Sequence, residues 1–154
     1  MQDDFIKIQT ADFDLAEQYK LLCQSSAGKI GAVIVFAGLV RDISNGSLKA
    51  MELEHYPGMT QTYLKTIVQK ARTRWSLLAV RVIHRIGRLQ PCDQIVYVGV
   101  ASCHRDDAFK ASEYIMDYLK QDAPFWKAEI TDAGKHWVAA KATDQQADQR
   151  WQSV

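Results

Sequence analysis

The sequence has few cysteines and no long apolar run. Its 154 residues include three cysteines, Cys23, Cys92 and Cys103, which are widely separated and form no Cys-x-x-Cys pair. Neither a disulfide framework nor a zinc site is expected from them, and this usage is typical of a reducing cytoplasm. No apolar stretch is long enough to cross a membrane, and residues 1–30 lack the basic start of a secretory signal. We therefore expect a soluble, cytoplasmic protein.

Excess charge of either sign is also missing. Nineteen Lys and Arg residues against eighteen Asp and Glu residues leave a formal net charge of +1. Binding to nucleic acid or to a membrane surface normally needs a basic excess, so neither partner is expected. Any anionic ligand should be small and held by a local cluster of cations. Apolar residues make up 47% of the chain, which is enough for one core and predicts a single domain over residues 1–154.

Several motifs that would assign a chemistry are absent. The sequence contains no Walker loop, no dinucleotide glycine fingerprint and no Gly-x-Ser-x-Gly elbow. It also has no cluster of His and Cys residues with metal-ligand spacing. We therefore expect neither a metal nor another cofactor.

Hydrophobic periodicity predicts strands that alternate with helices. Strands are expected over residues 5–8, 31–40, 48–56, 79–87, 94–101 and 126–131. Helices are expected over residues 15–24, 60–75 and 104–121, and the polar tail 143–151 is a further candidate. In the third helix apolar residues recur at spacings of three and four, at Ala108, Ala111, Ile115 and Leu119. This order predicts an α+β sandwich in which helices cover a mixed sheet.

Local features refine some of these elements. Asp12 or Asp14 is expected to cap the first helix, and Thr60 the second. The segment 31–40 is apolar throughout and has several β-branched residues, which predicts a central strand rather than one with a wet face. Asn45-Gly46 tolerates positive φ and predicts a hairpin that joins this strand to the next one.

Cationic and titratable groups are concentrated between residues 104 and 127. His104 and Arg105 come where an expected strand ends and a helix begins, and the unpaired N–H groups and dipole of a helix start favour an anion there. Alternatively, His104 is simply a first-turn residue and Arg105 an exposed charge. Local positive charge in an otherwise balanced chain favours an anion-binding site.

Two lysines of this segment, Lys120 and Lys127, are candidates for chemistry. Lys120 lies four residues after Met116 and shares its helix face, although a lysine near a helix C-terminus is commonly a surface residue that compensates the dipole. Lys127 follows the rigid apolar segment 124–126, which is expected to strip water from its ammonium group. Desolvation beside other cations lowers the pKa of a lysine, and a neutral amine is a nucleophile or base. The alternative for Lys127 is a strand-edge lysine that faces solvent.

Arg41 and His84 each have a functional and a structural interpretation. Arg41 ends an expected strand in which Gly38 permits close approach of a ligand, and its guanidinium could hold a phosphate with two parallel hydrogen bonds. It could also pair with Asp42 or Glu54. His84 lies within an apolar strand, which favours a hydrogen-bonded core histidine over a ligand.

Taken together, the sequence resembles the large, catalytic subunit of molybdopterin synthase from about residue 31 to residue 151. Motifs of that family occur in the family's order and near its spacing: Phe36-x-Gly38-x-x-Arg41, Glu52-x-Glu54-His55-Tyr56, His84-Arg85-x-Gly87, Ser102-x-His104-Arg105, Tyr114-x-x-Asp117-x-Leu119-Lys120 and Pro124-x-Trp126-Lys127-x-Glu129. Each motif is short, but six of them in register are strongly specific. Residues 1–30 carry little that matches.

The resemblance implies a fold of the α/β hammerhead type, a two-layer sandwich with a mixed, largely antiparallel sheet and covering helices. It also implies a homodimer at the centre of a heterotetramer, with a small ubiquitin-like subunit docked on each protomer. That partner would insert a C-terminal Gly-Gly tail that ends in a thiocarboxylate. The implied enzyme is a sulfurtransferase of molybdenum cofactor biosynthesis, which places two sulfurs on cyclic pyranopterin monophosphate to make the molybdopterin dithiolene.

The resemblance further implies roles for particular residues. Lys120 and Lys127 are the implied catalytic residues, with Lys120 beside the partner's tail and Lys127 acting on the substrate as acid, base or electrostatic stabiliser. Substrate contacts are expected from these two lysines and from Arg41, His104, Arg105, Val40 and Ala128. The walls of the pocket are expected to include Phe36 and Met116.

The sequence departs from the family's usual pattern at three positions. Leu39 stands where some members have lysine, Cys103 where alanine is common, and Ala128 where a second basic residue often follows the Trp-Lys pair. The loss of two possible cations bears on phosphate affinity more than on reaction type. A second class of function also stays open, a non-catalytic adaptor whose basic groove binds a carboxylate-terminated peptide. An adaptor would tolerate the loss of Lys127, whereas a synthase would not.

Overall fold

The computed structural model describes residues 3–43, 46–138 and 150–152. Its elements are, in chain order, β1 (Asp3–Gln9), α1 (Leu15–Gln24), β2 (Ala32–Leu39), β3 (Ala50–His55), α2 (Met59–Arg74), β4 (Ala79–Arg85), β5 (Gly87–Leu89), β6 (Gln94–Ser102), α3 (Arg105–Gln121), β7 (Phe125–Thr131) and β8 (Gly134–Trp137). No helix in this part of the chain is long and apolar enough to cross a membrane. The terminal helix expected over residues 143–151 lies almost wholly outside the described residues.

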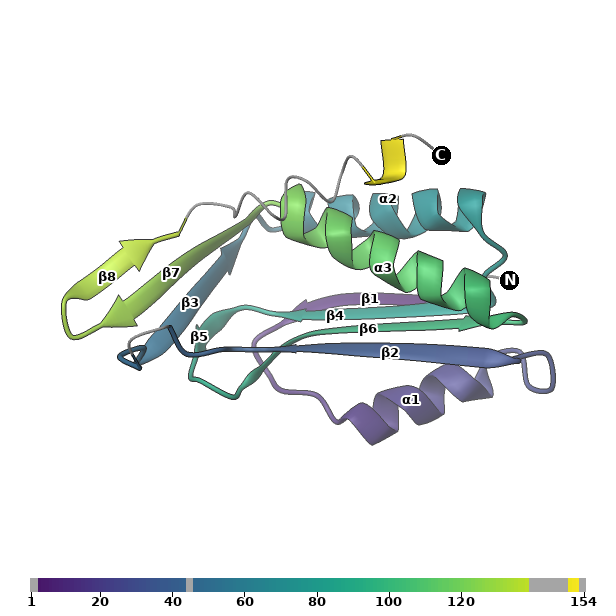
Figure 1. The fold of residues 1–154 in the computed structure, drawn as a ribbon, viewed down its shortest axis with the longest axis horizontal. Coiled ribbons are helices and arrows are strands. Elements are labelled where there is room, and N and C mark those ends of the chain that lie inside the picture. Colours follow the sequence, from purple (N-terminus) through teal and green to yellow (C-terminus); the bar gives the residue numbers. More distant parts are fainter. Residues whose placement is uncertain (1–2, 44–45, 139–149, 153–154) are drawn as a thin grey trace.

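The described strands form two four-stranded sheets, ordered β1-β4-β6-β2 and β5-β3-β7-β8. In the first sheet β1 and β4 are parallel and the other pairs are antiparallel, whereas every pair in the second sheet is antiparallel. Helices α2 and α3 cover one face of the first sheet and α1 covers the other (Figure 1). The α+β class with mixed, largely antiparallel pairing and covering helices is confirmed, but the strands are divided between two sheets.

The main core lies between the first sheet and helices α2 and α3. The predicted stripe of α3 faces it, and its members are at most 5% exposed: Ala108, Ala111, Ile115 and Leu119. Each fully buried large aliphatic side chain stabilises the fold by roughly 1.5–3 kcal/mol. This packing fixes the rotation of α3 about its axis and therefore the direction of its polar side chains.

The predicted caps are right for α1 and wrong for α2. Asp14 is the N-cap of α1, and its side chain accepts a hydrogen bond from the Glu17 N–H at 2.8 Å. Helix α2 begins one residue early, after Gly58, whose φ of 82° suits glycine. Thr60 is instead buried, and its hydroxyl accepts from the Tyr56 N–H and donates to the Pro124 carbonyl, each at 3.0 Å. It therefore ties the start of α2 to the turn that follows α3.

The prediction of a central strand over residues 31–40 is wrong. Within the described residues β2 pairs only with β6 and lies at the edge of the first sheet. Three of its apolar side chains are exposed, Val35 by 38%, Phe36 by 40% and Leu39 by 54%. A continuous apolar run predicts burial, but not whether this chain or another one provides it.

The predicted hairpin between β2 and β3 is also wrong, because the two strands belong to different sheets. Turn chemistry is nevertheless present. Gly46 has a φ of 70°, and its N–H donates to the Ile43 carbonyl at 2.9 Å, while Asn45 lies outside the described residues. The connection carries the chain from one sheet to the other, so it brings the end of β2 next to β3.

Candidate functional site

A cavity of about 270 Å³ lies where the two sheets meet beneath the C-terminal end of α3. Much of its wall is apolar and comes from several elements, with Phe36 and Leu39 of β2, Leu53 of β3, Ile95 of β6, Leu119 of α3 and Phe125 of β7. Polar side chains also reach it, namely His84, Lys120, Gln121 and Lys127. An apolar cavity with a few convergent polar groups is the usual form of a small ligand site.

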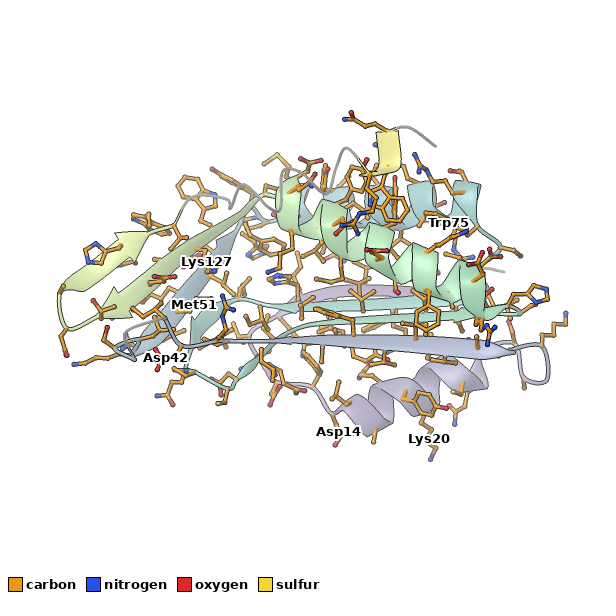
Figure 2. All side chains as sticks on the ribbon, in the orientation of Figure 1. Asp14, Lys20, Asp42, Met51, Trp75 and Lys127 are labelled. Carbon is orange, nitrogen blue, oxygen red and sulfur yellow. The ribbon has the colours of Figure 1, made fainter. Side chains whose placement is uncertain are left out.

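Strand pairing explains why Lys127 faces the cavity. Lys127 of β7 lies opposite Leu53 of β3, so the two side chains share one face of the second sheet. Successive side chains of a strand alternate, which sends Trp126 to the other face, where it contacts Tyr56 with ring centroids 5.4 Å apart. Figure 2 shows Lys127 and Met51, another lining residue, in the second sheet.

Helix packing brings Lys120 to the same cavity. Lys120 lies in the last turn of α3, next to the buried Leu119. Helix α3 ends at Gln121, and the short turn after it starts β7 at Phe125, so the chain doubles back within a few residues. Lys127 is half-buried and Lys120 is exposed at the cavity wall. Two lysines from different elements thus line one cavity.

His84 is buried, as its apolar strand predicts, but it also forms part of the cavity wall. Its ring stacks on Phe125 with centroids 3.8 Å apart and an interplanar angle of 18°. Its Nδ1 lies 2.8 Å from the Arg85 carbonyl oxygen, which can only accept, so Nδ1 carries the proton. Burial lowers the pKa of His84 to about 4; the Arg85 hydrogen bond opposes this shift, and the charges of Lys120 and His55 add to it. The ring is therefore neutral at neutral pH.

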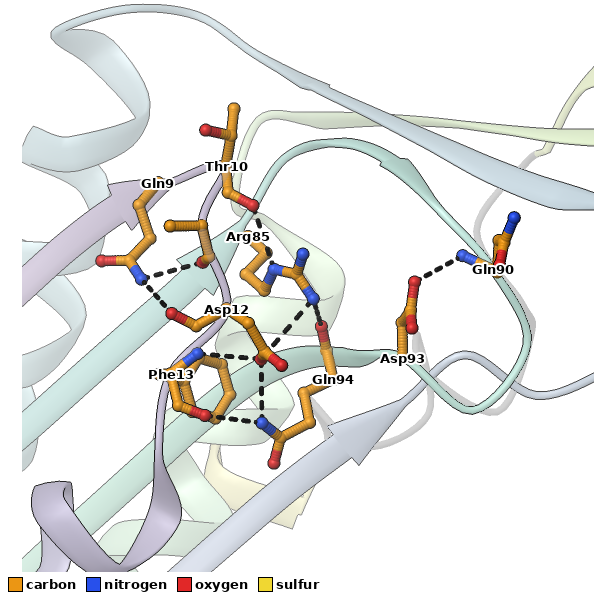
Figure 3. Close-up of polar contacts among 9 residues, drawn as sticks. Gln9, Thr10, Asp12, Phe13, Arg85, Gln90, Asp93 and Gln94 are labelled. Carbon is orange, nitrogen blue, oxygen red and sulfur yellow. Dashed lines mark hydrogen bonds and ion pairs between the residues drawn. The ribbon is translucent and has the colours of Figure 1, made fainter.

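The neighbouring Arg85 anchors the end of β4 from outside the cavity. Its guanidinium donates to the Gln94 carbonyl at 2.9 Å and to the Thr10 carbonyl at 3.1 Å (Figure 3). The carboxylate of Asp12 lies 3.6 Å away and accepts from the Gln94 side chain at 2.9 Å, and this hydrogen bond is the main cause that lowers the pKa of Asp12. These contacts join β4, β6 and the segment before α1, and they hold the strand that carries His84.

The two residues expected in the pocket walls are placed differently. Phe36 lines the cavity and is 40% exposed. Met116 does not line it, because this side chain packs against the edge of the main core. The family resemblance was the reason to expect Met116 there. Met116 shares a helix face with Lys120, but one helical turn is enough to move a side chain out of a small cavity.

Arg41 lies just beyond the cavity, two residues after the lining residue Leu39, and is exposed. Asp42, one of its possible ion-pair partners, accepts a hydrogen bond from the Leu48 N–H at 3.0 Å. Arg41 is therefore not among the residues that line the cavity.

The backbones of Val40 and Ala128 were expected to flank a phosphate, and both residues are buried. The Val40 N–H donates to the Asp93 carbonyl and its carbonyl accepts from the Cys92 N–H, both at 2.8 Å. Ala128 is enclosed within the second sheet, between its pairing partners in β3 and β8. The polar groups of Val40 are therefore already engaged in this conformation.

His104 and Arg105 lie at the opposite end of α3 and are both exposed. Fifteen residues of α-helix separate Arg105 from Lys120, a rise of about 22 Å. The first turn of α3 also contains Asp106 and Asp107, whose carboxylates offset the positive end of the helix dipole. Within a single chain the structure does not bring the five predicted cations together: Lys120 and Lys127 line the cavity, Arg41 does not line it, and His104 and Arg105 lie at the other end of α3.

Sequence reasoning missed the place of His84 in the cavity wall. The position of His84 in an apolar strand indicated burial, and only the arrangement of two sheets shows that the strand ends at a cavity. Within the described residues no group of three His, Cys, Asp or Glu side chains is placed to hold a metal ion. The polar side chains that line the cavity are those of His84, Lys120, Gln121 and Lys127.

These features define a class, an α+β protein with a two-lysine cavity suited to an electron-rich ligand. Cations that line a cavity with apolar walls can stabilise negative charge on a bound ligand. Such a cavity fits a protein that binds or transfers an anionic group.

Comparison with known proteins narrows this class to one family. Residues 8–122 match the family model described as MoaE protein. The molybdopterin synthase catalytic subunit of Ralstonia nicotianae is 54% identical over 95% of this chain and 83% of its own length, and that of Salmonella typhimurium is 51% identical over 98% and 100%. The structure of the molybdopterin biosynthesis MoaE protein from Burkholderia ambifaria has a TM-score of 0.83 and 49% identity, covering 97% of this chain and 98% of that one. The chain belongs to the MoaE family, and the resemblance inferred from the motifs is confirmed.

Proposed function

We propose that Lys120 and Lys127 perform the sulfur transfer of molybdopterin synthase in the cavity between the two sheets. The chain belongs to the family of molybdopterin synthase catalytic subunits, which are sulfur-transferring enzymes of molybdenum cofactor biosynthesis. The observation that carries the residue assignment is that both lysines line one largely apolar cavity.

The proposed donor is a second, small subunit, because a catalytic subunit implies at least one other. A ubiquitin-like protein would insert a Gly-Gly tail whose terminal thiocarboxylate supplies the sulfur. Lys120 is exposed at the cavity wall, where an arriving tail can reach it. Its ammonium group would hold the negative charge of the thiocarboxylate and of the carboxylate that replaces it.

The proposed acceptor is cyclic pyranopterin monophosphate, which receives two sulfurs on adjacent carbons. Each transfer forms a carbon–sulfur bond on the substrate and breaks one of its carbon–oxygen bonds, while the carbon–sulfur bond of the tail breaks and the tail's carbonyl carbon takes an oxygen from water. In one transfer the oxygen that leaves the carbon stays on the opened cyclic phosphate, and in the other it departs as water. Lys127 is half-buried against Leu53 and Phe125, which suits an acid, base or electrostatic stabiliser acting on the bound substrate. Arg41 would bind the phosphate.

A second copy of the chain would complete the site. His104 and Arg105 are about 22 Å of helix away from Lys120 in their own chain, so they can contact the same substrate only from another protomer. The exposed apolar side chains of the edge strand β2, Val35, Phe36 and Leu39, support a proposed homodimer, because exposed edges and apolar patches are normally covered. The dimer with two small subunits would make a heterotetramer.

Reconstitution tests this function. Purified protein is mixed with thiocarboxylated small subunit and cyclic pyranopterin monophosphate, and the dithiolene product is quantified by mass spectrometry after alkylation. We expect Lys127→Gln to bind the small subunit normally and to make no product. The matched control is Lys135→Gln on the adjacent strand β8, which removes an exposed lysine paired with Glu52 and should leave the rate unchanged. A non-catalytic adaptor would make no product even as the wild type.

A further inference from the structure

His84 has no role in the function proposed so far, although it forms part of the cavity wall. Its Nδ1–H is used by the Arg85 carbonyl, which leaves Nε2 on the other side of the ring with a free lone pair. The described part of the chain offers Nε2 no hydrogen-bond partner. The stack on Phe125 fixes the plane of the ring, so this acceptor has a defined direction.

We propose that His84 is a positioning residue for the partner's tail: its Nε2 accepts a hydrogen bond from a glycine N–H of the tail, next to Lys120. This inference rests on the proposed function, because the tail belongs to the small subunit proposed above. It adds a residue that neither touches the reacting sulfur nor binds the phosphate.

The donors and acceptors of the cavity support a peptide as the ligand of His84. The ammonium groups of Lys120 and Lys127 can only donate, so they suit carboxylate and carbonyl oxygens. A buried tail also presents backbone N–H groups, which are unfavourable in an apolar space unless they find an acceptor. Besides Gln121, His84 is the side chain of the wall that can accept a hydrogen bond.

The narrow access to His84 favours glycine over a bulkier ligand. His84 is only 5% exposed, and the lining residues around it include Val96, Leu119 and Phe125. A glycine backbone has no Cβ and can approach a surface that other residues cannot. A fused ring system with a phosphate would need a wider opening to bring its N–H groups to the same atom.

Burial is the main cause that keeps the ring of His84 neutral and able to accept, and the charges of Lys120 and His55 act in the same direction. Lys120 reaches the cavity from α3, Lys127 from β7, and His55 of β3 also acts on the ring. A proton on Nε2 would be repelled by these groups and would remove the lone pair. With a pKa of about 4, the imidazole stays an acceptor at the neutral pH of the reaction.

Three substitutions of His84 distinguish the effect of the Nε2 acceptor from the effect of the ring's shape. His84→Phe keeps an aromatic ring to stack on Phe125 and removes both nitrogens. His84→Asn keeps a donor near the Nδ1 position and loses the acceptor, while His84→Gln can extend its carbonyl oxygen toward the Nε2 position. Calorimetry measures the affinity of each variant for the intact small subunit and for a small subunit that lacks its last two residues. Thermal unfolding is recorded for every variant.

We expect His84→Phe and His84→Asn to weaken binding of the intact subunit by about tenfold, the size of one lost hydrogen bond to a buried group. His84→Gln should recover most of this loss, and all variants should bind the truncated subunit equally well. If His84→Phe does not fold, the Asn and Gln pair gives the same comparison.

Other results would overturn the inference. Equal weakening of intact and truncated subunit would show a general structural effect, and no weakening would show that Nε2 makes no contact with the tail. Reduced affinity for cyclic pyranopterin monophosphate with unchanged subunit affinity would assign His84 to the substrate. If the wild type binds intact and truncated subunits equally, the tail does not enter the cavity, and the proposed function itself fails.

Discussion

Lys120 and Lys127 line the same cavity although one lies in a helix and the other in a strand of the second sheet. Their backbones are held independently, Lys120 through the packing of α3 on the main core and Lys127 through pairing with Leu53. Lys120 is exposed and Lys127 is half-buried. This difference supports separate roles for the two ammonium groups.

A mixed-dimer experiment tests whether two chains share one site. We expect Lys120→Ala and Arg105→Ala each to lose most activity alone. When both are co-expressed, random pairing gives mixed dimers. One site of a mixed dimer then has Lys120 from the Arg105→Ala chain and Arg105 from the Lys120→Ala chain and is intact, whereas the other site lacks both residues. Activity should return to about a quarter of wild type, because half of the dimers regain one of two sites.

The matched control for this experiment is the pair Lys120→Ala and Lys127→Ala. Both residues belong to the cavity of one chain, so a mixed dimer has one defect in each cavity and should stay inactive. Recovery with the control pair, or no recovery with the Arg105 pair, would contradict a site shared in this way.

The buried His84 predicts a pH dependence of stability. Its pKa is about 4 in the folded protein against 6.5 for a free histidine, so the unfolded chain takes up the proton first as pH falls. The stabilising contribution is complete above pH 6.5 and is lost as the pH falls toward 4. It amounts to roughly 3 kcal/mol.

Urea unfolding of wild type and His84→Phe between pH 4 and pH 7.5 measures this contribution. The free energy of unfolding of the wild type should fall more steeply as pH decreases, because the variant lacks this titrating group. Other groups titrate in both proteins and cancel in the difference. Parallel curves would show that His84 is not held neutral by the fold.

The ion pair between Arg72 and Asp4 predicts a large effect on stability far from the cavity. Arg72 of α2 donates from Nε to Asp4 of β1 at 2.8 Å and from a terminal nitrogen to the Leu77 carbonyl at 2.6 Å. Both side chains are largely buried, at 7% and 15% exposure. Arg72→Ala should lower the free energy of unfolding by about 3 kcal/mol, because Asp4 is left as a buried charge without its partner.

Arg72→Lys should restore only part of this loss, since an ammonium group cannot reproduce the paired hydrogen bonds of a guanidinium. Lys70→Ala, at an exposed position of the same helix, is the control and should change stability by less than about 0.5 kcal/mol. If urea unfolding gives Arg72→Ala and Lys70→Ala the same midpoint, the ion pair contributes nothing measurable.

Leu39 allows a test of whether one more positive charge at the cavity strengthens binding of the phosphate-bearing substrate. It lines the cavity and is 54% exposed. Leu39→Lys should lower the KM for the phosphate-bearing substrate by up to about fivefold at low salt, with less effect at high salt, because exposed charges are screened. Steady-state kinetics at two salt concentrations measure this change. Leu15→Lys on α1 alters the net charge equally and should leave KM unchanged, so a similar effect of both would contradict a local cause.

The sequence predicts local structure and chemistry well where short-range physics decides them. The spacing of Ala108, Ala111, Ile115 and Leu119 fixes the buried face of α3, and Asp14 caps α1 as expected. The family resemblance read from the order and spacing of short motifs is confirmed by the family model, which matches residues 8–122. These signals depend on neighbours within a few residues or on residue identity alone.

The order of strands in the sheets and the distances between remote residues could not be predicted from the sequence. The apolar run of β2 predicts burial, yet nothing in it shows that the strand ends a sheet. The short strand β8 has four exposed residues and no apolar pattern. The one local signal for it is Gly134, which has a φ of 108° and follows a turn. The distance between Arg105 and Lys120 follows from helix length, but a cluster of motifs in the sequence suggests proximity that one chain does not provide.

The most direct test is the rate of dithiolene formation by variants of the two cavity lysines. Purified Lys120→Ala, Lys127→Ala and the double variant are assayed with thiocarboxylated small subunit and cyclic pyranopterin monophosphate, beside the control Lys110→Ala, an exposed lysine on α3 paired with Asp106. The account predicts wild-type rates for Lys110→Ala, strongly reduced rates for each single variant and no detectable product for the double variant. Product at the full rate from the double variant would contradict it.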